Sequence, residues 1–231
     1  MVLKLHGSPH STCTSRVVVV LKEKNVPYEI VPVDLGAGEH KSATFLEHQP
    51  FGQVPYLVRT PPPTTPLDHP YLICSDFQVD DGFELYESRA IARYIAAKWA
   101  SQGTSLIPTE VKALGRFEQA ASIEQSNFDA FAAPLAFEKT FKPMFGQTPD
   151  EARIVELSGQ LDAKLAAYDK ILAKQKYLAG DEITLADLFH LPYGDLVQSA
   201  LDVFSKYPNV LRWWKEISSR PSWVAIKAAA A

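Results

Sequence analysis

The chain has 231 residues, of which 46% are hydrophobic and 22% charged, a composition typical of globular rather than disordered proteins. Its 23 basic and 27 acidic residues give a net charge of −4 with no basic tail or stripe, so nucleic acid is not an expected partner. The longest aliphatic run, Val17 to Leu21, is far shorter than the roughly 20 apolar residues that cross a bilayer, and no membrane span is expected.

Two isolated cysteines, Cys13 and Cys74, are the only thiols. They do not supply a disulfide framework or the four ligands of structural zinc, so we predict neither. Because no secretory signal opens the chain, we expect a reducing, cytoplasmic environment.

The first hundred residues alternate strand and helix patterns. We expect strands at 2–6, 28–35, 54–58 and 83–87, and helices at about 16–24, around Phe45 and Leu46, and from Ser88 onward. Pro32 cannot donate to a strand ladder, which places the second strand at a sheet edge. The order βαβα followed by ββα predicts a thioredoxin-like α/β domain.

The segment from Thr60 to Gly82 separates the third and fourth strands. Hairpin connections usually take about 2–5 residues, so this segment is interpreted as an inserted loop. It is either functional or a tolerated decoration.

Helical patterns dominate from about Pro108 onward. One face of a long helix carries apolar residues at steps of three and four, namely Ile154, Leu157, Leu161, Leu165, Tyr168 and Leu172. Thr184 and Asp187 have the spacing of a capping box, stapled by Ile183 and Leu188. We therefore predict two domains, 1–100 and an all-helical 108–231.

Three features of the α/β domain predict a binding groove. Hydroxyl side chains between Gly7 and Arg16 lie at the N-terminal end of the first helix, where free N–H groups favour negative charge, although simple capping explains them equally. Val54-Pro55 is a candidate cis peptide that would turn the backbone of Val54 outward to pair with an extended peptide. Ser88 is expected to cap the third helix, whose N-terminus would hold a carboxylate.

At these residues the sequence resembles the glutathione transferases, most of all their phi class. The resemblance covers nearly the whole chain. Its most specific motifs are Pro9-His10-Ser11-Thr12 with Arg16, Gly38-Glu39-His40-Lys41, Pro50 to Pro55, Glu87 to Ile91, Phe141 to Gly146 and Leu178 to Asp187. The resemblance implies a thioredoxin-like domain followed by a helical one, a homodimer, and transfer of glutathione to apolar electrophiles in detoxification, without a metal.

The resemblance also implies roles for individual residues. Ser11 would donate a hydrogen bond to the glutathione sulfur, and Phe51 would contact the partner subunit. The residues that would bind glutathione are His40, Lys41, Gln53, Val54, Pro55, Glu87 and Ser88. The acceptor pocket would be lined by His10, Thr12, Leu35, Phe137 and Phe141.

Several alternatives stay open. Thr12 and Ser15 are minor alternatives to Ser11, whereas Cys13 is interpreted as a packed or partly exposed thiol. The same fold also supports glutathione-dependent hydroperoxide reduction, or a non-catalytic carrier or scaffold. The insertion departs from the family pattern and is predicted to remodel the dimer edge. Asp187, His190, Tyr193 and the tryptophans Trp213, Trp214 and Trp223 are interpreted as packing or capping residues.

Overall fold

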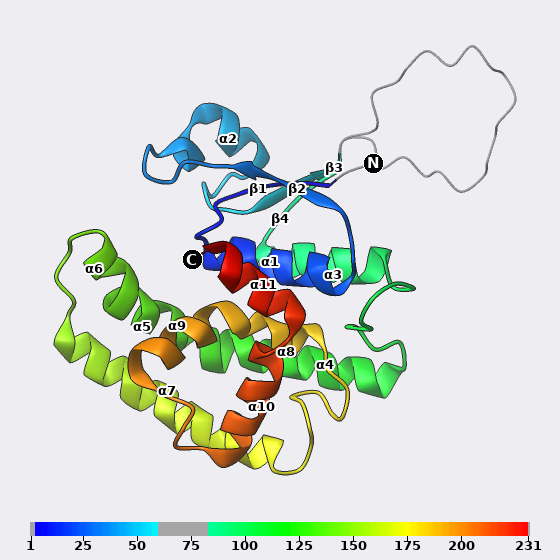
Figure 1. Ribbon diagram of the computed structural model, residues 1–231, viewed down its shortest axis with the longest axis vertical. Helices are drawn as coiled ribbons and strands as arrows, with labels where there is room; N and C mark the ends of the chain where they lie inside the picture. The colour runs from blue at the N-terminus through cyan, green and yellow to red at the C-terminus, as the bar shows by residue number, and fades with distance from the viewer. Residues whose placement is uncertain (1–2, 60–82, 231) are drawn as a thin grey trace, which may run out of the picture.

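A computed structural model describes residues 3–59 and 83–230 of the chain (Figure 1). The predicted inserted loop, 60–82, lies outside the described residues, and so does Cys74. None of the helices in the described ranges is both long and apolar enough to cross a membrane.

The first domain is a four-stranded sheet with helices, as predicted. It contains β1 (Leu3–Gly7), α1 (Thr12–Glu23), β2 (Tyr28–Pro32), a 3-10 turn (Glu39–Lys41), α2 (Ala43–His48), β3 (Tyr56–Arg59), β4 (Glu84–Tyr86) and α3 (Ser88–Lys98). The strand order is β2-β1-β3-β4, with β1 parallel to β2 and both other pairs antiparallel. This is the thioredoxin-like arrangement, and β2, with Pro32 at its end, occupies the predicted edge.

One predicted helix start and one predicted cap are wrong, whereas α3 begins at Ser88 as predicted. Helix α1 begins at Thr12 rather than near Arg16, because Ser11 serves as its N-cap and the hydroxyl-bearing residues that follow are helical. In α3 the cap position belongs to Glu87, and Ser88 is already the first helical residue. The Ser88 hydroxyl accepts a hydrogen bond from Arg16 instead of capping its own helix.

The second domain is helical. Its elements are α4 (Val111–Glu124), a π-turn (Gln125–Asp129), α5 (Ala130–Ala136), a second π-turn (Phe137–Phe141), α6 (Lys142–Met144), α7 (Glu151–Leu172), α8 (Leu185–Phe189), α9 (Leu191–Leu201), α10 (Pro208–Ser218) and α11 (Pro221–Ala230). The predicted apolar face of α7 is buried along its whole length. Helix α1 lies between the sheet and this domain and packs against α3, α8, α9 and α11 (Figure 1).

The capping box of α8 is present as predicted and extends into the core. The Asp187 carboxylate is fully buried and accepts hydrogen bonds from the backbone of Leu178, from both the backbone and the hydroxyl of Thr184, and from Nε1 of Trp213 at 2.9 Å. Burial raises the pKa of Asp187, while these donors act to lower it. The carboxylate thus connects the loop before α8 to α10, which supports the structural interpretation of this residue.

His190 is a fully buried histidine in the same core. Its Nδ1 lies 2.8 Å from the carbonyl oxygen of Ala186, which can only accept, so Nδ1 carries the proton. Nε2 then accepts from the hydroxyl of Tyr168 at 3.0 Å. Desolvation lowers the pKa of His190 to about 3, and the ring is therefore neutral in the folded protein.

Acid should weaken the fold through His190. Below the usual histidine pKa the unfolded chain takes up a proton at this site, whereas the folded protein does not until pH falls to about 3. This site alone should lower the free energy of unfolding by up to about 1.4 kcal/mol per pH unit across that window. Urea unfolding between about pH 6.5 and 4.5, compared with His190→Asn, tests this. The stability difference between the two proteins should shrink as the pH falls, and parallel pH dependences would contradict the assignment.

Candidate active site

Ser11 lies at the junction of the β1–α1 turn and the first turn of α1. Its backbone is extended, with φ −82° and ψ 127°, and its Oγ accepts a hydrogen bond from the backbone N–H of Thr14 at 3.3 Å. The side chain is half-buried. Because the backbone donor occupies one lone pair of the oxygen, the hydroxyl hydrogen remains able to donate to an external group.

The β1–α1 turn packs against a cis-proline. The Val54–Pro55 peptide is cis, as predicted. A Cβ added to Gly7 would lie 2.6 Å from Oγ1 of Thr14 and 3.3 Å from Cβ of Pro55, so only glycine permits this close approach. The approach brings the turn that carries Ser11 next to the outward-facing backbone at Val54.

Hydrogen bonds from the Lys41 side chain connect the 3-10 turn to the loop that precedes the cis-proline. Its Nζ donates to the carbonyl oxygen of Gly52 at 2.7 Å and to that of Phe51 at 3.3 Å. Gly52 has a φ of +60°, and a Cβ there would lie 2.8 Å from the carbonyl oxygen of His40. Nδ1 of His40 is buried without a hydrogen-bond partner in the described part of the chain, as a ligand-binding donor would be. Gln53, next along the loop, is exposed.

Arg16 connects the first turn of α1, which follows Ser11, to the start of α3. Only 1% of this residue is exposed. Nη1 donates to Oγ of Ser88 at 3.1 Å and to Sγ of Cys13 at 3.5 Å, and Nε donates to the carbonyl oxygen of Phe189 at 3.3 Å. Glu87, which precedes Ser88, has a φ of +70° and an exposed side chain. Such a strained backbone in a non-glycine residue is most common at functional sites.

Four charged side chains form what we name the interdomain cluster: Arg16, Arg89, Glu124 and Asp129. Arg89 donates to both carboxylate oxygens of Glu124, at 2.7 and 2.8 Å, and pairs with Asp129 at 3.1 Å. Asp129 also accepts from Nη2 of Arg16 at 3.1 Å. These partners raise the pKa of Arg89 against the effect of burial. The cluster is formally neutral, which permits its burial.

The π-turn explains how both carboxylates reach the arginines. Glu124 and Asp129 are five residues apart, so an α-helix would point them in different directions, whereas a π-turn aligns residues at this spacing. The sequence alone contains no motif for this turn, and the cluster was not predicted.

The predicted acceptor residues come from separate elements. His10 is exposed, Thr12 and Phe141 are half-buried, and Leu35 and Phe137 expose 39% and 43% of their surface. Phe137 and Phe141 lie on the second π-turn, whereas Leu35 follows β2. Exposed apolar side chains at the edges of both domains suit an apolar substrate.

Tyr193 of α9 is a site residue that the sequence analysis assigned to packing alone. Its ring lies over the guanidinium of Arg16, 5.6 Å from ring centre to Cζ. Burial raises the pKa of Tyr193, and the neighbouring Thr12 hydroxyl partly opposes this rise. Tyr193 therefore borders the first turn of α1, next to Ser11. No local sequence signal indicates this, because the contact joins opposite ends of the chain.

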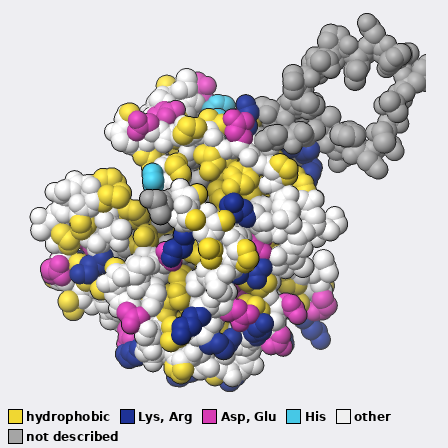
Figure 2. Space-filling model, in the orientation of Figure 1, with side chains coloured by type: hydrophobic (Ala, Val, Ile, Leu, Met, Phe, Trp, Pro, Cys, Tyr) yellow, Lys and Arg dark blue, Asp and Glu magenta, His cyan; other side chains and the backbone are white. Residues whose placement is uncertain are grey.

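The surface carries no band of one charge on the face that Figure 2 shows. Basic and acidic side chains are interspersed over the lower part of this face, and hydrophobic side chains gather over its upper middle. Interspersed charges without a basic band do not favour a polyanion as a ligand of this face.

Comparisons with known proteins agree with this geometry. Residues 10–98 match the family model of the glutathione S-transferase N-terminal domain, and residues 132–221 match that of the C-terminal domain. Glutathione S-transferase PM239X14 of Arabidopsis thaliana is 44% identical over 92% of this chain and 89% of its own. The crystal structure of glutathione transferase F7 from Populus trichocarpa superimposes with a TM-score of 0.86 at 39% identity, covering 100% of both chains.

A further solved structure contains a glutathione conjugate. Maize glutathione S-transferase I in complex with an atrazine glutathione conjugate has a TM-score of 0.82 and 30% identity, covering 99% of this chain and 97% of its own. The matched models and relatives together span almost the whole chain. The chain belongs to the glutathione S-transferase family.

Proposed function

We propose that this protein is a glutathione transferase in which the Ser11 hydroxyl activates the glutathione thiol for attack on apolar electrophiles. The observation that carries the proposal is the geometry of Ser11. Its oxygen is held by the Thr14 N–H at the N-terminal end of α1, with the hydroxyl hydrogen free to donate to sulfur. Family membership and the glutathione conjugate in the maize structure support the substrate assignment.

The required stabilisation is within reach of these groups. A free thiol with a pKa of about 8.5 is only about 3% ionised at neutral pH, and the thiolate is the nucleophile. Lowering the pKa by about two units needs roughly 2.7 kcal/mol. A hydrogen bond to a charged acceptor supplies about 1.5–3 kcal/mol, and the helix N-terminus about 0.3–1 kcal/mol more. Ser11 and α1 therefore suffice without a general base.

The remaining glutathione groups find matching partners in this arrangement. The glycyl carboxylate would be bound by the unpaired Nδ1 of His40 and the third proton of Lys41, two of whose protons go to loop carbonyls. The backbone of Val54, beside cis-Pro55, would pair with the cysteinyl residue, with Gln53 adjacent. The γ-glutamyl end would meet the Glu87 carboxylate and the Ser88 hydroxyl.

The electrophile would bind across the exposed apolar residues of both domains. The thiolate attacks the electrophilic carbon, a carbon–sulfur bond forms, and the leaving group departs with its electron pair. His10, Thr12, Leu35, Phe137 and Phe141 would line this region. Detoxification in the cytoplasm fits such a broad apolar surface. The alternative activity, reduction of hydroperoxides, would use the same glutathione thiolate. It is measured with an organic hydroperoxide as the substrate in place of the electrophile.

Replacing Ser11 by alanine should raise the pKa of bound glutathione. Loss of a charge-assisted hydrogen bond of about 1.5–3 kcal/mol corresponds to a rise of about one to two pKa units. Thiolate absorbance against pH measures this value directly. Ser42→Ala is the matched control, because Ser42 caps α2 with the same 3.3 Å bond to a backbone N–H. An unchanged pKa in Ser11→Ala, or an equal rise in both variants, would overturn the role of Ser11.

Gly52→Ala should weaken glutathione binding. The added Cβ collides with the carbonyl of His40 and the side chain of Lys41, so the cationic group cannot hold its position. The KM for glutathione should rise about tenfold, with a smaller change in kcat at saturation. Gly146→Ala is the control, since Gly146 has a similar φ of +69° with no atom within 4 Å of the added Cβ. Equal KM values in the two variants would contradict this placement of the carboxylate site.

A homodimer formed through the first domain is part of the proposal. Phe51 is 64% exposed, its ring centre lies 6.2 Å from that of Tyr86, and Tyr86 and Phe83 expose 36% and 38% of their surface. Exposed apolar rings grouped in this way typically mark an interface. The family resemblance supports the assignment of Phe51 to the subunit contact.

Phe51→Asp should convert the dimer to a monomer, because a charge would be buried in an apolar contact. Sedimentation velocity measures the mass. Phe145→Asp, at a residue with a similar 62% exposure in the helical domain, should leave the mass unchanged. A wild-type protein that sediments as a monomer would refute the proposed dimer.

A further inference from the structure

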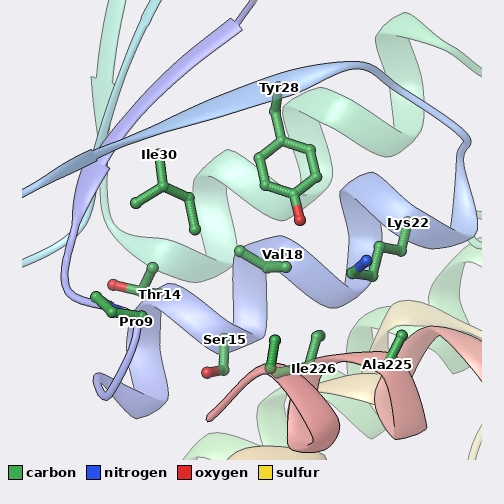
Figure 3. A pocket seen from close by; sticks show the side chains of 10 residues that line it. Pro9, Thr14, Ser15, Val18, Lys22, Tyr28, Ile30, Ala225 and Ile226 are labelled. Carbon is green, nitrogen blue, oxygen red and sulfur yellow. The ribbon is translucent and has the colours of Figure 1, made fainter.

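A cleft separate from the proposed active site lies beneath the last helix. It has a volume of about 110 Å³ and opens where α11 crosses α1 and β2 (Figure 3). Its lining comes from the two ends of the chain, since α1 and β2 belong to the first domain and α11 to the second. None of the residues assigned above to glutathione or the acceptor lines this cleft.

The middle of the cleft is apolar. Val18, only 5% exposed, and Ile30 face Ile226, which is 9% exposed, across the space (Figure 3). Ala225 also lines the cleft, and its side chain is only a methyl group. At about 110 Å³ this open cleft is smaller than the enclosed apolar cavity of roughly 150 Å³ that binds benzene, so it has room for one aromatic ring at most and not for a fused polycyclic compound.

One end of the cleft is cationic. The Lys22 side chain lies above Ala225, and the Tyr28 hydroxyl points down into the cleft between Val18 and Lys22 (Figure 3). No carboxylate in the described part of the chain pairs with Lys22, because the adjacent Glu23 is engaged by Arg220 at 2.6 and 2.7 Å and by Thr104. Burial raises the pKa of Tyr28, so its hydroxyl is a hydrogen-bond donor at neutral pH. An anionic group on the ring would complete this end.

We propose that this cleft binds a small aromatic carboxylate, with the ring between Val18 and Ile226 and the carboxylate at Lys22 and Tyr28. The cleft also touches the catalytic turn from behind. Thr14 lines it, and the backbone N–H of Thr14 holds the Ser11 hydroxyl. The ligand would occupy its site together with glutathione, and the proposal does not depend on the role of Ser11.

Calorimetric titration with benzoate and with toluene tests the ligand class. Both compounds should bind the wild-type protein saturably. Lys22→Met should weaken benzoate about fivefold and leave toluene unchanged, since only the carboxylate loses its partner. Lys112→Met is the control, because Lys112 is exposed on α4 and has no ion pair within the described residues. Equal losses of benzoate in the two lysine variants would overturn the proposed contact.

A substitution that fills the cleft tests whether the ligand binds there. Ala225→Leu should abolish binding of both compounds, whereas Ala228→Leu should not, because Ala228 is exposed on the same helix outside the cleft. Saturating glutathione and an S-alkyl glutathione should leave benzoate affinity unchanged. Competition by either, binding that survives Ala225→Leu, or no binding of benzoate at concentrations up to about 10 mM would each refute the site.

Discussion

The buried pairing of Arg16 and Arg89 with Glu124 and Asp129 fixes the position of the active-site residues. Arg16 comes from the helix that begins at Ser11, and Arg89 directly follows Ser88. Both are held by carboxylates of the helical domain. Because a buried charge without its partner costs several kcal/mol, the two domains cannot separate or rotate without losing all of these pairs together. The proposed glutathione subsites in the first domain are thus positioned by residues of the second.

The C-terminal end of α1 is also held by hydrogen bonds to distant parts of the chain. Glu23 accepts two hydrogen bonds from Arg220 at 2.7 and 2.6 Å and others from Thr104 and Ser222, which joins α1 to the start of α11. The buried Lys24 ammonium donates to the carbonyl oxygens of Ala100 and Thr104 in the connection between the domains. Helix α1 therefore has Ser11, the proposed activating residue, at its N-terminus, while its C-terminus is bonded to the interdomain connection and to α11. Rigid support of this kind keeps a hydroxyl within hydrogen-bonding reach of a thiolate.

Local signals account for the parts of the structure that the sequence predicts correctly. Proline chemistry identifies the edge position of β2 and the cis peptide at Pro55, and helical periodicity identifies the buried face of α7. The spacing of Thr184 and Asp187 predicts their capping box. Each of these rests on residues within a few positions of one another, where backbone geometry alone decides the outcome.

Apart from the start of α1, which a local cap decides, the failures involve partners that are distant in sequence. Serine is a common helix-capping residue, yet the Ser88 hydroxyl accepts a hydrogen bond from Arg16, which belongs to another helix. Tyr193 resembles a core residue, yet it lies over the same guanidinium. The sequence of the π-turn at Gln125–Asp129 shows no local preference for this conformation. The turn allows Glu124 and Asp129 to pair with arginines of the first domain, and these ion pairs form only in the folded protein. Such features require the assembled tertiary structure.

The interdomain cluster also constrains how this sequence can diverge. Any single substitution that removes a charge from one of its four positions leaves the buried cluster with an unbalanced charge, and loss of Arg89 or Asp129 also leaves Glu124 or Arg16 without an ion-pair partner, a state that selection would remove through loss of folded protein. Replacing an arginine and its carboxylate together by apolar residues of similar volume avoids that state and can even be neutral for stability. Divergence at these positions is therefore expected in concerted steps, so that related chains either keep the whole cluster or have lost it in matched pairs.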